Sequence, residues 1–315
     1  MKRFENLDGV STKKTFADFR RWQQERKQKK KDLSYSVPHV ERPEYAQLHT
    51  NQSHPLLAWV GHSTFVMQIN GITIVTDPVW ALRMGTAKRL TAPGITIEEM
   101  PPVDVVLISH GHYDHLHFAS IKKLKGNPRF FVPVGLGRLF RRRGYQHVTE
   151  FAWWDEKEYK GVTFTFVPAQ HWTRRTLFDT NTSHWGGWVM QATGQPTIYF
   201  AGDSGYFRGF RDIGERFAID YALLPIGAYE PEWFMGPQHT TPEEAVQAFL
   251  DCRAKTFIPM HYGAFRLADD TPKEALDRLM AEWQRRQLEH DRLICLKLGE
   301  VLHCVTSSKE KAPIF

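Results

Sequence analysis

The stretch VDVVLIS-HGHYDH occupies residues 103–115 and decides the fold. Its first seven residues are mostly apolar and β-branched, which is typical of a buried strand. The six that follow place His110, His112, Asp114 and His115 in the turn that ends this strand. We expect His110 and His112 to point at one metal ion, and Asp114 and His115 at a second. Imidazole and carboxylate ligands together favour zinc or a first-row neighbour over calcium or magnesium.

Four ligands cannot close two metal sites, so further ligands must follow other buried strands. Apolar runs at residues 163–168, 197–200 and 256–260 are followed by His171, Asp203 and His261. Before Asp203, Gly202 would let the backbone come close to an ion. Each residue alone is more often a cap or a structural histidine. Four strands that end in this way, in a chain with 15 His among 315 residues, favour one shared binuclear site over surface histidines placed by chance.

These residues resemble the ligand set of the metallo-β-lactamase-fold superfamily, whose HxHxDH motif matches residues 110–115. The resemblance implies two Zn²⁺ ions per chain, one held by His110, His112 and His171, the other by Asp114, His115 and His261, with Asp203 as the bridge. It also implies an α+β fold, a four-layer αββα sandwich.

Within that superfamily the chain is similar to the N-acylphosphatidylethanolamine-hydrolysing phospholipase D family over residues 55–300. The motifs that carry this similarity are GHST at 61–64, TDP at 76–78, SHGHYDHL at 109–116, QHW at 170–172, FAGDSGY at 200–206, PIGAYEP at 225–231, WFM at 233–235, QH at 238–239 and PEEA at 242–245. The block 229–245 is far more specific than HxHxDH. The family implies hydrolysis of N-acylphosphatidylethanolamine to an N-acylethanolamine and phosphatidic acid.

A binuclear zinc site also suits this reaction on chemical grounds. Two ions roughly 3.5 to 4 Å apart lower the pKa of bridging water and stabilise charge on the non-bridging oxygens of a phosphodiester. We therefore expect a zinc phosphodiesterase of phospholipase D type that uses a metal-bridging hydroxide, with Asp114 and Asp203 as catalytic ligands and a phospholipid or other phosphodiester as substrate. The alternative is a zinc hydrolase of a small ester or lactone. A non-hydrolytic module is disfavoured, because a structural zinc usually closes with four ligands.

Two residues are candidates to support the ligands. Asp77 is placed to accept a hydrogen bond from a ligating imidazole, and His62 could do similar work from the neighbouring strand. Either could instead be a buried structural group.

Three residues are candidates to bind the substrate. Tyr113 and His239 match positions that contact the phospholipid in the family, and His239 would hydrogen-bond a phosphate oxygen or protonate the leaving alkoxide. Arg174, next to Arg175, would form a cationic rim for an anionic head group, or only a solvated pair. The cluster at 233–235 could line an acyl groove or belong to the core.

The charge of the chain is concentrated at its start. Residues 1–31 carry 11 Lys or Arg and 4 acids, whereas the rest carries 30 basic and 31 acidic residues. Phe16, Phe19 and Trp22 lie at helical spacing within this segment. It would either lie on an anionic bilayer, at about 1 kcal/mol per Lys near the surface, or pack its aromatic side chains on the body. We expect a basic arm at 1–50 and the hydrolase domain at 51–315.

Composition and local sequence patterns also predict where the protein resides, its partners and its secondary structure. No run of 18 apolar residues and no apolar signal region are evident, and Cys252, Cys295 and Cys304 fit a reducing compartment. We expect a cytoplasmic protein with peripheral membrane contact through 1–31; a homodimer is compatible with the sequence. No nucleic-acid partner is expected, because no recognised module is present. We predict strands at 56–60, 63–69 and 72–76, and helices at 119–125 and after Thr241 and Thr271.

Overall fold

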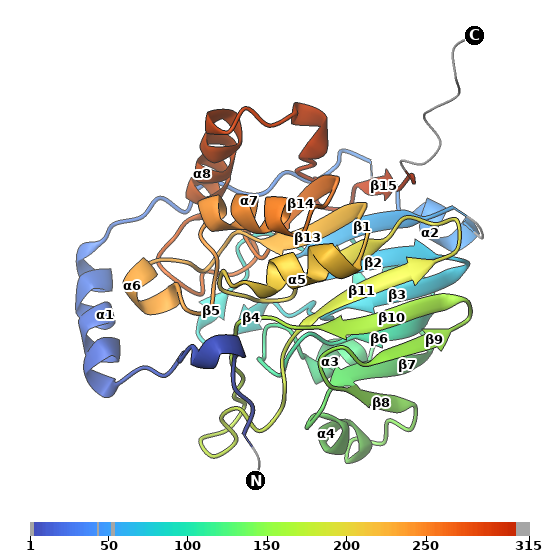
Figure 1. Cartoon of the computed structure of the whole chain (residues 1–315), viewed down its shortest axis with the longest axis horizontal. Helices are drawn as coiled ribbons and strands as arrows, with labels where there is room; N and C mark the ends of the chain where they lie inside the picture. Colours follow the sequence, from blue (N-terminus) through green and yellow to red (C-terminus); the bar gives the residue numbers. More distant parts are fainter. Residues whose placement is uncertain (1–2, 43, 52–53, 307–315) are drawn as a thin grey trace.

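The computed structural model describes residues 3–42, 44–51 and 54–306, which form two β-sheets flanked by helices (Figure 1). The ends of the expected arm and hydrolase domain, residues 1–2 and 307–315, lie outside the described residues, as do 43 and 52–53. The first sheet has seven strands in the order β15-β1-β2-β3-β6-β7-β8. Its strands are β1 (Leu56–Gly61), β2 (Thr64–Ile69), β3 (Ile72–Thr76), β6 (Val103–Leu107), β7 (Gly126–Pro133), β8 (Val148–Phe151) and β15 (Val301–His303).

The second sheet has six strands in the order β14-β13-β12-β11-β10-β9. Its strands are β9 (Glu156–Tyr159), β10 (Val162–Val167), β11 (Gly187–Ala192), β12 (Ile198–Phe200), β13 (Tyr221–Pro225) and β14 (Thr256–Met260). Both sheets are mixed: β3, β6, β7 and β8 pair in parallel in the first, and β12, β13 and β14 in the second. A separate hairpin joins β4 (Arg83–Met84) to β5 (Ala87–Lys88).

The two sheets pack face to face on an aromatic core. Phe65 of β2 meets Phe200 of β12 at 6.5 Å between ring centroids, and Phe131 of β7 meets Phe164 of β10 at 5.1 Å. Residues alternate across each strand, so Leu57 and Trp59 enter this core while Leu56 and Ala58 face outward. All six positions of β1 are buried, because helices cover the outer face as well.

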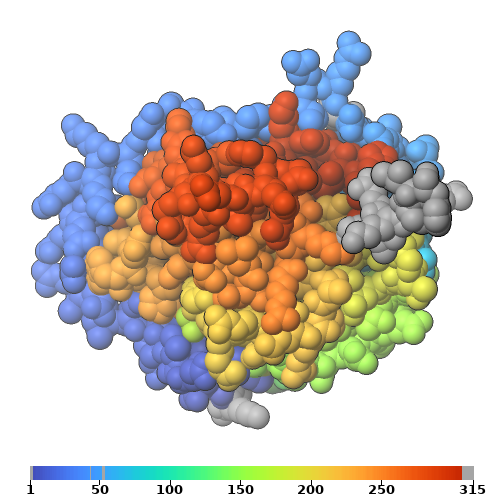
Figure 2. All heavy atoms as spheres, turned by 45° about the horizontal axis from the view of Figure 1, so that its top comes forward, coloured from blue at the N-terminus to red at the C-terminus, as the bar shows by residue number. Residues whose placement is uncertain are grey.

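Helices form the two outer layers. On the first sheet lie α2 (Ala46–Thr50), α3 (Phe118–Ile121) and α4 (Gly137–Arg141), which bury Leu48, Ile121 and Phe140. On the second sheet lie α5 (Gly209–Arg216), α7 (Pro242–Asp251) and α8 (Pro272–Arg285), whose Phe249 and Trp283 pack on Phe257 of β14. Figure 2 shows this second helical layer from outside, in yellow to red. The expected four-layer αββα sandwich is confirmed.

Most predicted elements are present. The strands predicted at 56–60, 63–69 and 72–76 correspond to β1, β2 and β3. Thr241 and Thr271 cap α7 and α8 by accepting hydrogen bonds from the backbone N–H of Glu244 and Glu274, with Pro in the first turn of each. The helix predicted at 119–125 is wrong in extent, because α3 ends at Ile121 and the chain turns to enter β7 at Gly126.

The N-terminal segment packs on the body through α1 (Phe16–Gln28). In both figures α1, in blue, lies at the left edge beside α6 (Glu232–Met235). Trp22 is buried, stacks on Phe234 with 5.0 Å between ring centroids, and donates from Nε1 to Asp269 at 3.0 Å. Phe234 and Met235 therefore belong to a small core, and Trp233 is partly exposed. Short 3₁₀ turns occur at Leu7–Gly9, Ile97–Glu99 and His290–Arg292.

Among the described residues, every helix is too short or too polar to cross a lipid bilayer.

Candidate metal centre

The seven predicted ligands follow four strands and meet at one end of the two sheets. His110, His112, Asp114 and His115 follow β6 of the first sheet; His171, Asp203 and His261 follow β10, β12 and β14 of the second. Parallel strands such as β12, β13 and β14 bring their carboxyl ends to the same edge, which places Asp203 and His261 together.

One group of candidate ligands consists of three histidines. His112 Nδ1 lies 2.9 Å from His110 Nε2 and 3.2 Å from His171 Nε2. All three nitrogens converge on one point, so the group could hold a metal ion. This is the trio expected to share the first ion.

The second group contains Asp114, His115 and His261, together with His62. Asp114 Oδ2 lies 3.4 Å from His115 Nε2, 3.9 Å from His261 Nε2 and 3.1 Å from His62 Nε2. His62, expected to support a ligand from outside, thus reaches the same carboxylate oxygen as the predicted ligands. It either adds a nitrogen to this group or orients Asp114.

Asp203 joins the two groups through one oxygen. Its Oδ2 lies 3.1 Å from both His115 Nε2 and His261 Nε2, 3.8 Å from His171 Nε2 and 4.0 Å from His110 Nε2. A carboxylate between two ligand sets is the arrangement that a bridging ligand requires.

The chemistry of these residues fits bound cations. Burial lowers the pKa of His112 to about 3 and of His171 to about 4, so both imidazoles are neutral at pH 7 and have a lone pair to offer. Burial opposes charge on His261 as well, but Asp203 outweighs it and raises the pKa of His261 to about 9. Without a metal, protonated His261 therefore balances part of the carboxylate charge. Among the described residues, buried His115 Nε2, His261 Nε2 and Asp203 Oδ1 have no well-aligned hydrogen-bond partner, which is costly unless a cation satisfies them.

Asp77 supports a ligand in each group. Its Oδ2 accepts from His115 Nδ1 at 2.7 Å and from Ser109 Oγ at 2.5 Å, and its Oδ1 accepts from the backbone N–H of Ser109 at 2.7 Å. Because the Ser109 hydroxyl proton goes to Asp77, Ser109 Oγ accepts from His110 Nδ1 at 2.9 Å. These bonds leave Nε2 of both His115 and His110 directed at the cluster, as second contacts to ligating histidines usually do.

The backbone is bent sharply at the strand ends. His62, Asp77 and His261 have φ of 56°, 35° and 62°, a region that non-glycine residues rarely adopt and that is often found at functional sites. Gly202 has φ of 63°, and a Cβ there would meet Ser109 Cβ at 2.6 Å. Positive φ and close packing against the segment after β6 both favour glycine at this position.

The expected substrate contacts have different environments. His239 is buried, with its Nδ1 4.0 Å from Asp203 Oδ2 and without a hydrogen-bond partner among the described residues. Tyr113 is 51% exposed and donates to the carbonyl of Arg175 at 3.1 Å. Arg174 is exposed beside Trp172, whereas Arg175 donates to the carbonyls of Gly111 and Leu116 and so braces the HGHYDH turn.

The family follows from comparison with known proteins. The model of the beta-lactamase superfamily domain matches residues 73–262, from β3 to just beyond β14, and so includes all seven candidate ligands and Asp77. The chain belongs to the metallo-β-lactamase superfamily. It is a metal-dependent hydrolase of that superfamily.

Two relatives with similar sequences point to one family within the superfamily. This superfamily member is 35% identical over 266 residues to "N-acyl-phosphatidylethanolamine-hydrolyzing phospholipase D 1" of Caenorhabditis elegans, covering 77% of this chain and 74% of that protein. It is also 35% identical over 259 residues to the mitochondrial phospholipase D of the same description from Saccharomyces cerevisiae, covering 77% of this chain but only 54% of the yeast protein. The family resemblance read from the sequence motifs is confirmed.

A solved structure agrees on the fold. Igni18, described as a novel metallo hydrolase from Ignicoccus hospitalis, superposes with a TM-score of 0.61 at 23% identity and covers 79% of this chain and 98% of its own. At that identity the likeness shows the metallo-β-lactamase fold alone.

Sequence reasoning missed three contributors to this metallo-β-lactamase site. Ser109 links Asp77 to His110, and the carbonyl of Gln238 accepts from His171 Nδ1 at 2.9 Å. Arg175 was considered only as a rim charge. Ser109 and Gln238 directly precede His110 and His239. Their position in the SHGHYDHL and QH motifs was the one sequence signal that could have indicated a role at the site.

Proposed function

We propose that this chain is a binuclear zinc phosphodiesterase of phospholipase D type, which hydrolyses N-acylphosphatidylethanolamine to an N-acylethanolamine and phosphatidic acid. The observation that carries the proposal is the position of Asp203 Oδ2, within 4.0 Å of ligand nitrogens from both groups. The relatives that bear this activity in their names support the substrate class.

The distances between ligand atoms divide the proposed ligands into two groups. His110, His112 and His171 would hold one Zn²⁺, and Asp114, His115 and His261 would hold the other, with Asp203 close enough to serve both. Zinc in such a pair supplies Lewis acidity toward phosphoryl oxygens and makes water acidic near neutral pH. The protein supplies imidazoles whose rings are fixed by Asp77, Ser109 and Gln238, and these contacts hold the ligand nitrogens in position before substrate arrives.

His239 acts on the substrate in this proposal. Its buried Nδ1 lies close to Asp203 and has no hydrogen-bond partner in the part of the chain that the structure describes, so it can meet a phosphate oxygen beside both ligand groups. Burial, above all, holds the pKa of His239 well below its ordinary value. The ring is therefore neutral at pH 7, which favours hydrogen bonding to a phosphate oxygen over protonation of the leaving alkoxide.

Tyr113 and Arg174 are proposed to contact the head group at the outer edge of the site. Tyr113 belongs to the HGHYDH turn itself, and Arg174 lies three residues beyond His171, so both are close in sequence to ligands. Their exposure suits contact with a substrate that enters from outside.

Product analysis on phosphatidylcholine vesicles that contain N-acylphosphatidylethanolamine tests the proposal. We expect an N-acylethanolamine and phosphatidic acid, loss of both products after chelation, and recovery when zinc is restored. Diacylglycerol as a product, or full activity without metal, would contradict it. Hydrolysis of small esters or lactones, with none of the phospholipid, would support the alternative hydrolase.

Two variants separate the proposed roles. Asp203→Asn is expected to lower turnover at least about a hundredfold and to reduce bound zinc below two per chain, because it removes the shared ligand. His239→Ala is expected to lower turnover by about a hundredfold with two zinc ions retained. Elemental analysis and circular dichroism on both variants distinguish loss of metal from loss of fold. Full activity and two metals in Asp203→Asn would contradict the bridge.

A further inference from the structure

Besides the basic N-terminal arm, the body contains a strongly basic stretch of its own. Residues 115–149 contain eight Lys or Arg and no Asp or Glu. They form α3, β7 and α4, and the basic side chains at 138 and 141–143 are exposed on and just after α4. The overall neutrality of the body conceals this local excess of positive charge.

Several cations of the arm are engaged within the protein instead. Arg26 pairs with Asp269 at 3.3 Å, and Lys31 pairs with Glu230 and Glu274 at 2.9 and 2.8 Å. The buried residue of α1, Trp22, packs against Phe234 of α6. Part of the charge and aromatic surface that suggested a membrane-binding arm therefore contacts the body, while Phe16 and Phe19 are exposed.

The loop that follows ligand His171 exposes two adjacent apolar side chains. Leu177 is 81% exposed and Phe178 is 88% exposed, the two highest values among the large apolar residues described. The loop is ordered by Asp179, whose Oδ1 accepts from the backbone N–H of Arg175 and Thr176 at 3.0 and 2.7 Å. In Figure 1 it is the yellow-green loop that projects at the bottom, at the same end as α4. Apolar side chains held outward on a braced loop usually mark an interaction site.

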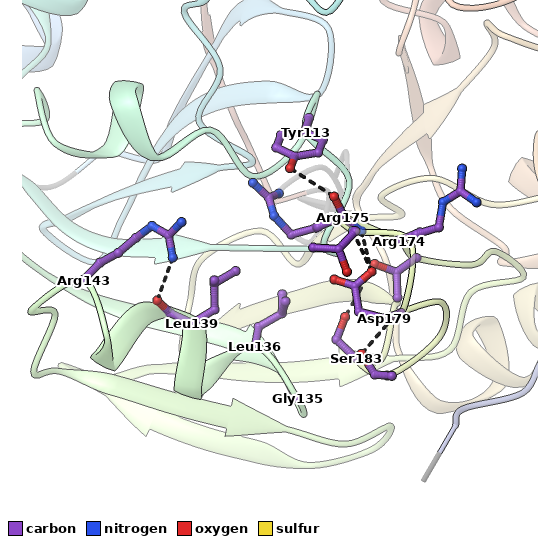
Figure 3. A pocket seen from close by; sticks show the side chains of 12 residues that line it. Tyr113, Gly135, Leu136, Leu139, Arg143, Arg174, Arg175, Asp179 and Ser183 are labelled. Atoms are coloured by element: carbon purple, nitrogen blue, oxygen red, sulfur yellow. Dashed lines mark hydrogen bonds between the residues drawn. The ribbon is translucent and has the colours of Figure 1, made fainter. Parts of the chain in front are cut away.

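A pocket of about 240 Å³ joins this loop to α4 (Figure 3). Its lining includes Arg143 beside α4, Arg174 and Arg175 from the loop, and Tyr113 from the HGHYDH turn; Asp179 is the acid that faces it. The Arg175 guanidinium lies 4.0 Å from the centre of the Tyr113 ring. The pocket therefore places positive charge next to Tyr113 of the HGHYDH turn.

We propose that the loop at 174–178 and the basic surface of α4 form a docking surface for an anionic phospholipid bilayer. Leu177 and Phe178 enter the interfacial region, and the arginines at 138, 142 and 143 contact lipid phosphates, whereas Arg141 pairs with Glu150 at 2.9 Å. Apolar side chains flanked by cations suit this partner, because burial of apolar surface and attraction to anionic lipids act together. The inference rests on the proposed phospholipid substrate, which such a surface would bring to the metal-ligand turn.

Vesicle co-sedimentation tests the docking surface without any need for hydrolysis. The probes are vesicles of phosphatidylcholine alone and vesicles with phosphatidylglycerol added, neither of which contains an N-acylated lipid. The variant is Leu177→Ser with Phe178→Ser; the matched control is Phe16→Ser with Phe19→Ser, which removes two exposed aromatic residues from α1. A second variant, Arg138→Glu with Arg142→Glu, tests the charge.

We expect the wild type and the α1 control to bind the anionic vesicles, and the loop variant to bind at least about tenfold more weakly. The charge variant should lose its preference for phosphatidylglycerol. Hydrolysis of a monomeric short-chain N-acylated phosphodiester should be unchanged in the loop variant. Absence of that hydrolysis in the wild type would refute the proposed function while leaving the binding result intact.

Three results would overturn the docking surface. One is wild-type binding by the loop variant; another is loss of binding in the α1 control alone. The third is a change of oligomeric state in the loop variant, which would assign Leu177 and Phe178 to contacts between copies of the chain. Binding of short duplex RNA that competes fully with vesicles and does not depend on Leu177 and Phe178 would indicate a nucleic-acid surface, and would equally refute the proposal.

Discussion

At the scale of single residues, Asp77 reaches both groups of candidate ligands. It orients His115 directly and His110 through Ser109, and all four side chains are buried. A carboxylate in such surroundings is unfavourable on its own, since burial raises its pKa, but the bonds from His115 and Ser109 oppose that shift. The arrangement makes the orientation of two imidazoles depend on one side chain.

Asp77→Asn should therefore weaken zinc binding by about ten- to a hundredfold, because an amide holds His115 Nδ1–H less strongly than a carboxylate does. Competition with a chromophoric chelator measures the affinity. Ser109→Ala serves as the matched control and should have a smaller effect, since it removes only the branch to His110. Equal affinity in Asp77→Asn and the wild type would contradict the supporting role.

At the scale of elements, Trp22 is the buried residue through which α1 packs on the body. The ring stacks on Phe234 of α6 and its Nε1 reaches buried Asp269, while Phe16 at the start of the helix is 76% exposed. Thr15 and Asp18 form a reciprocal cap that begins the helix, but the isolated helix of 13 residues would be only marginally stable in water. Its order thus depends on this contact with the body.

Trp22→Ala should lower the free energy of unfolding by about 3 kcal/mol, through lost apolar burial and the loss of the hydrogen bond to Asp269 Oδ2. Urea denaturation measures the change, and limited proteolysis should show new cleavage within 3–31. Phe16→Ala should leave the free energy of unfolding within about 0.5 kcal/mol of the wild type, and the proteolysis pattern unchanged. Equal stability of the two variants would show that α1 is held by other contacts.

At the scale of the whole molecule, the candidate metal centre connects the two sheets. His110, His112, Asp114 and His115 follow a strand of the first sheet, whereas His171, Asp203 and His261 follow strands of the second. Ions bound between them would link elements that are otherwise joined by the aromatic core. A ligand that binds only the folded state stabilises it according to its affinity and concentration.

Removal of metal should consequently lower thermal stability while the fold persists, because the core between the sheets does not include the ligands. With free zinc about a hundredfold above its dissociation constant, the loss is about 2.7 kcal/mol, or on the order of 5 °C in Tm. Calorimetry before and after chelation, and again after zinc is restored, measures the shift. An unchanged Tm in protein shown to have lost its metal would contradict a link between the sheets.

Much of the fold and of the candidate site was predictable because the relevant signals are local in sequence. A β-branched run followed by a histidine or aspartate can be recognised without knowing which distant residues it contacts. Four such runs, each followed by a residue type that binds the same kind of metal, predicted the cluster. The caps at Thr241 and Thr271 are equally local. The helix expected at 119–125 was too long because the start of β7, set by pairing with β6, limits it.

The sequence by itself determined the residue types at the ends of the strands, and with them the family and the candidate ligands. The tertiary structure alone decided what depends on contacts between distant segments: that Asp77 reaches His110 through Ser109, that His62 joins Asp114, and that cations of the arm are neutralised by the body. It also decided that Leu177 and Phe178 face outward beside α4. The physical reason is that burial and electrostatic pairing are set by three-dimensional neighbours, which spacing along the chain does not specify.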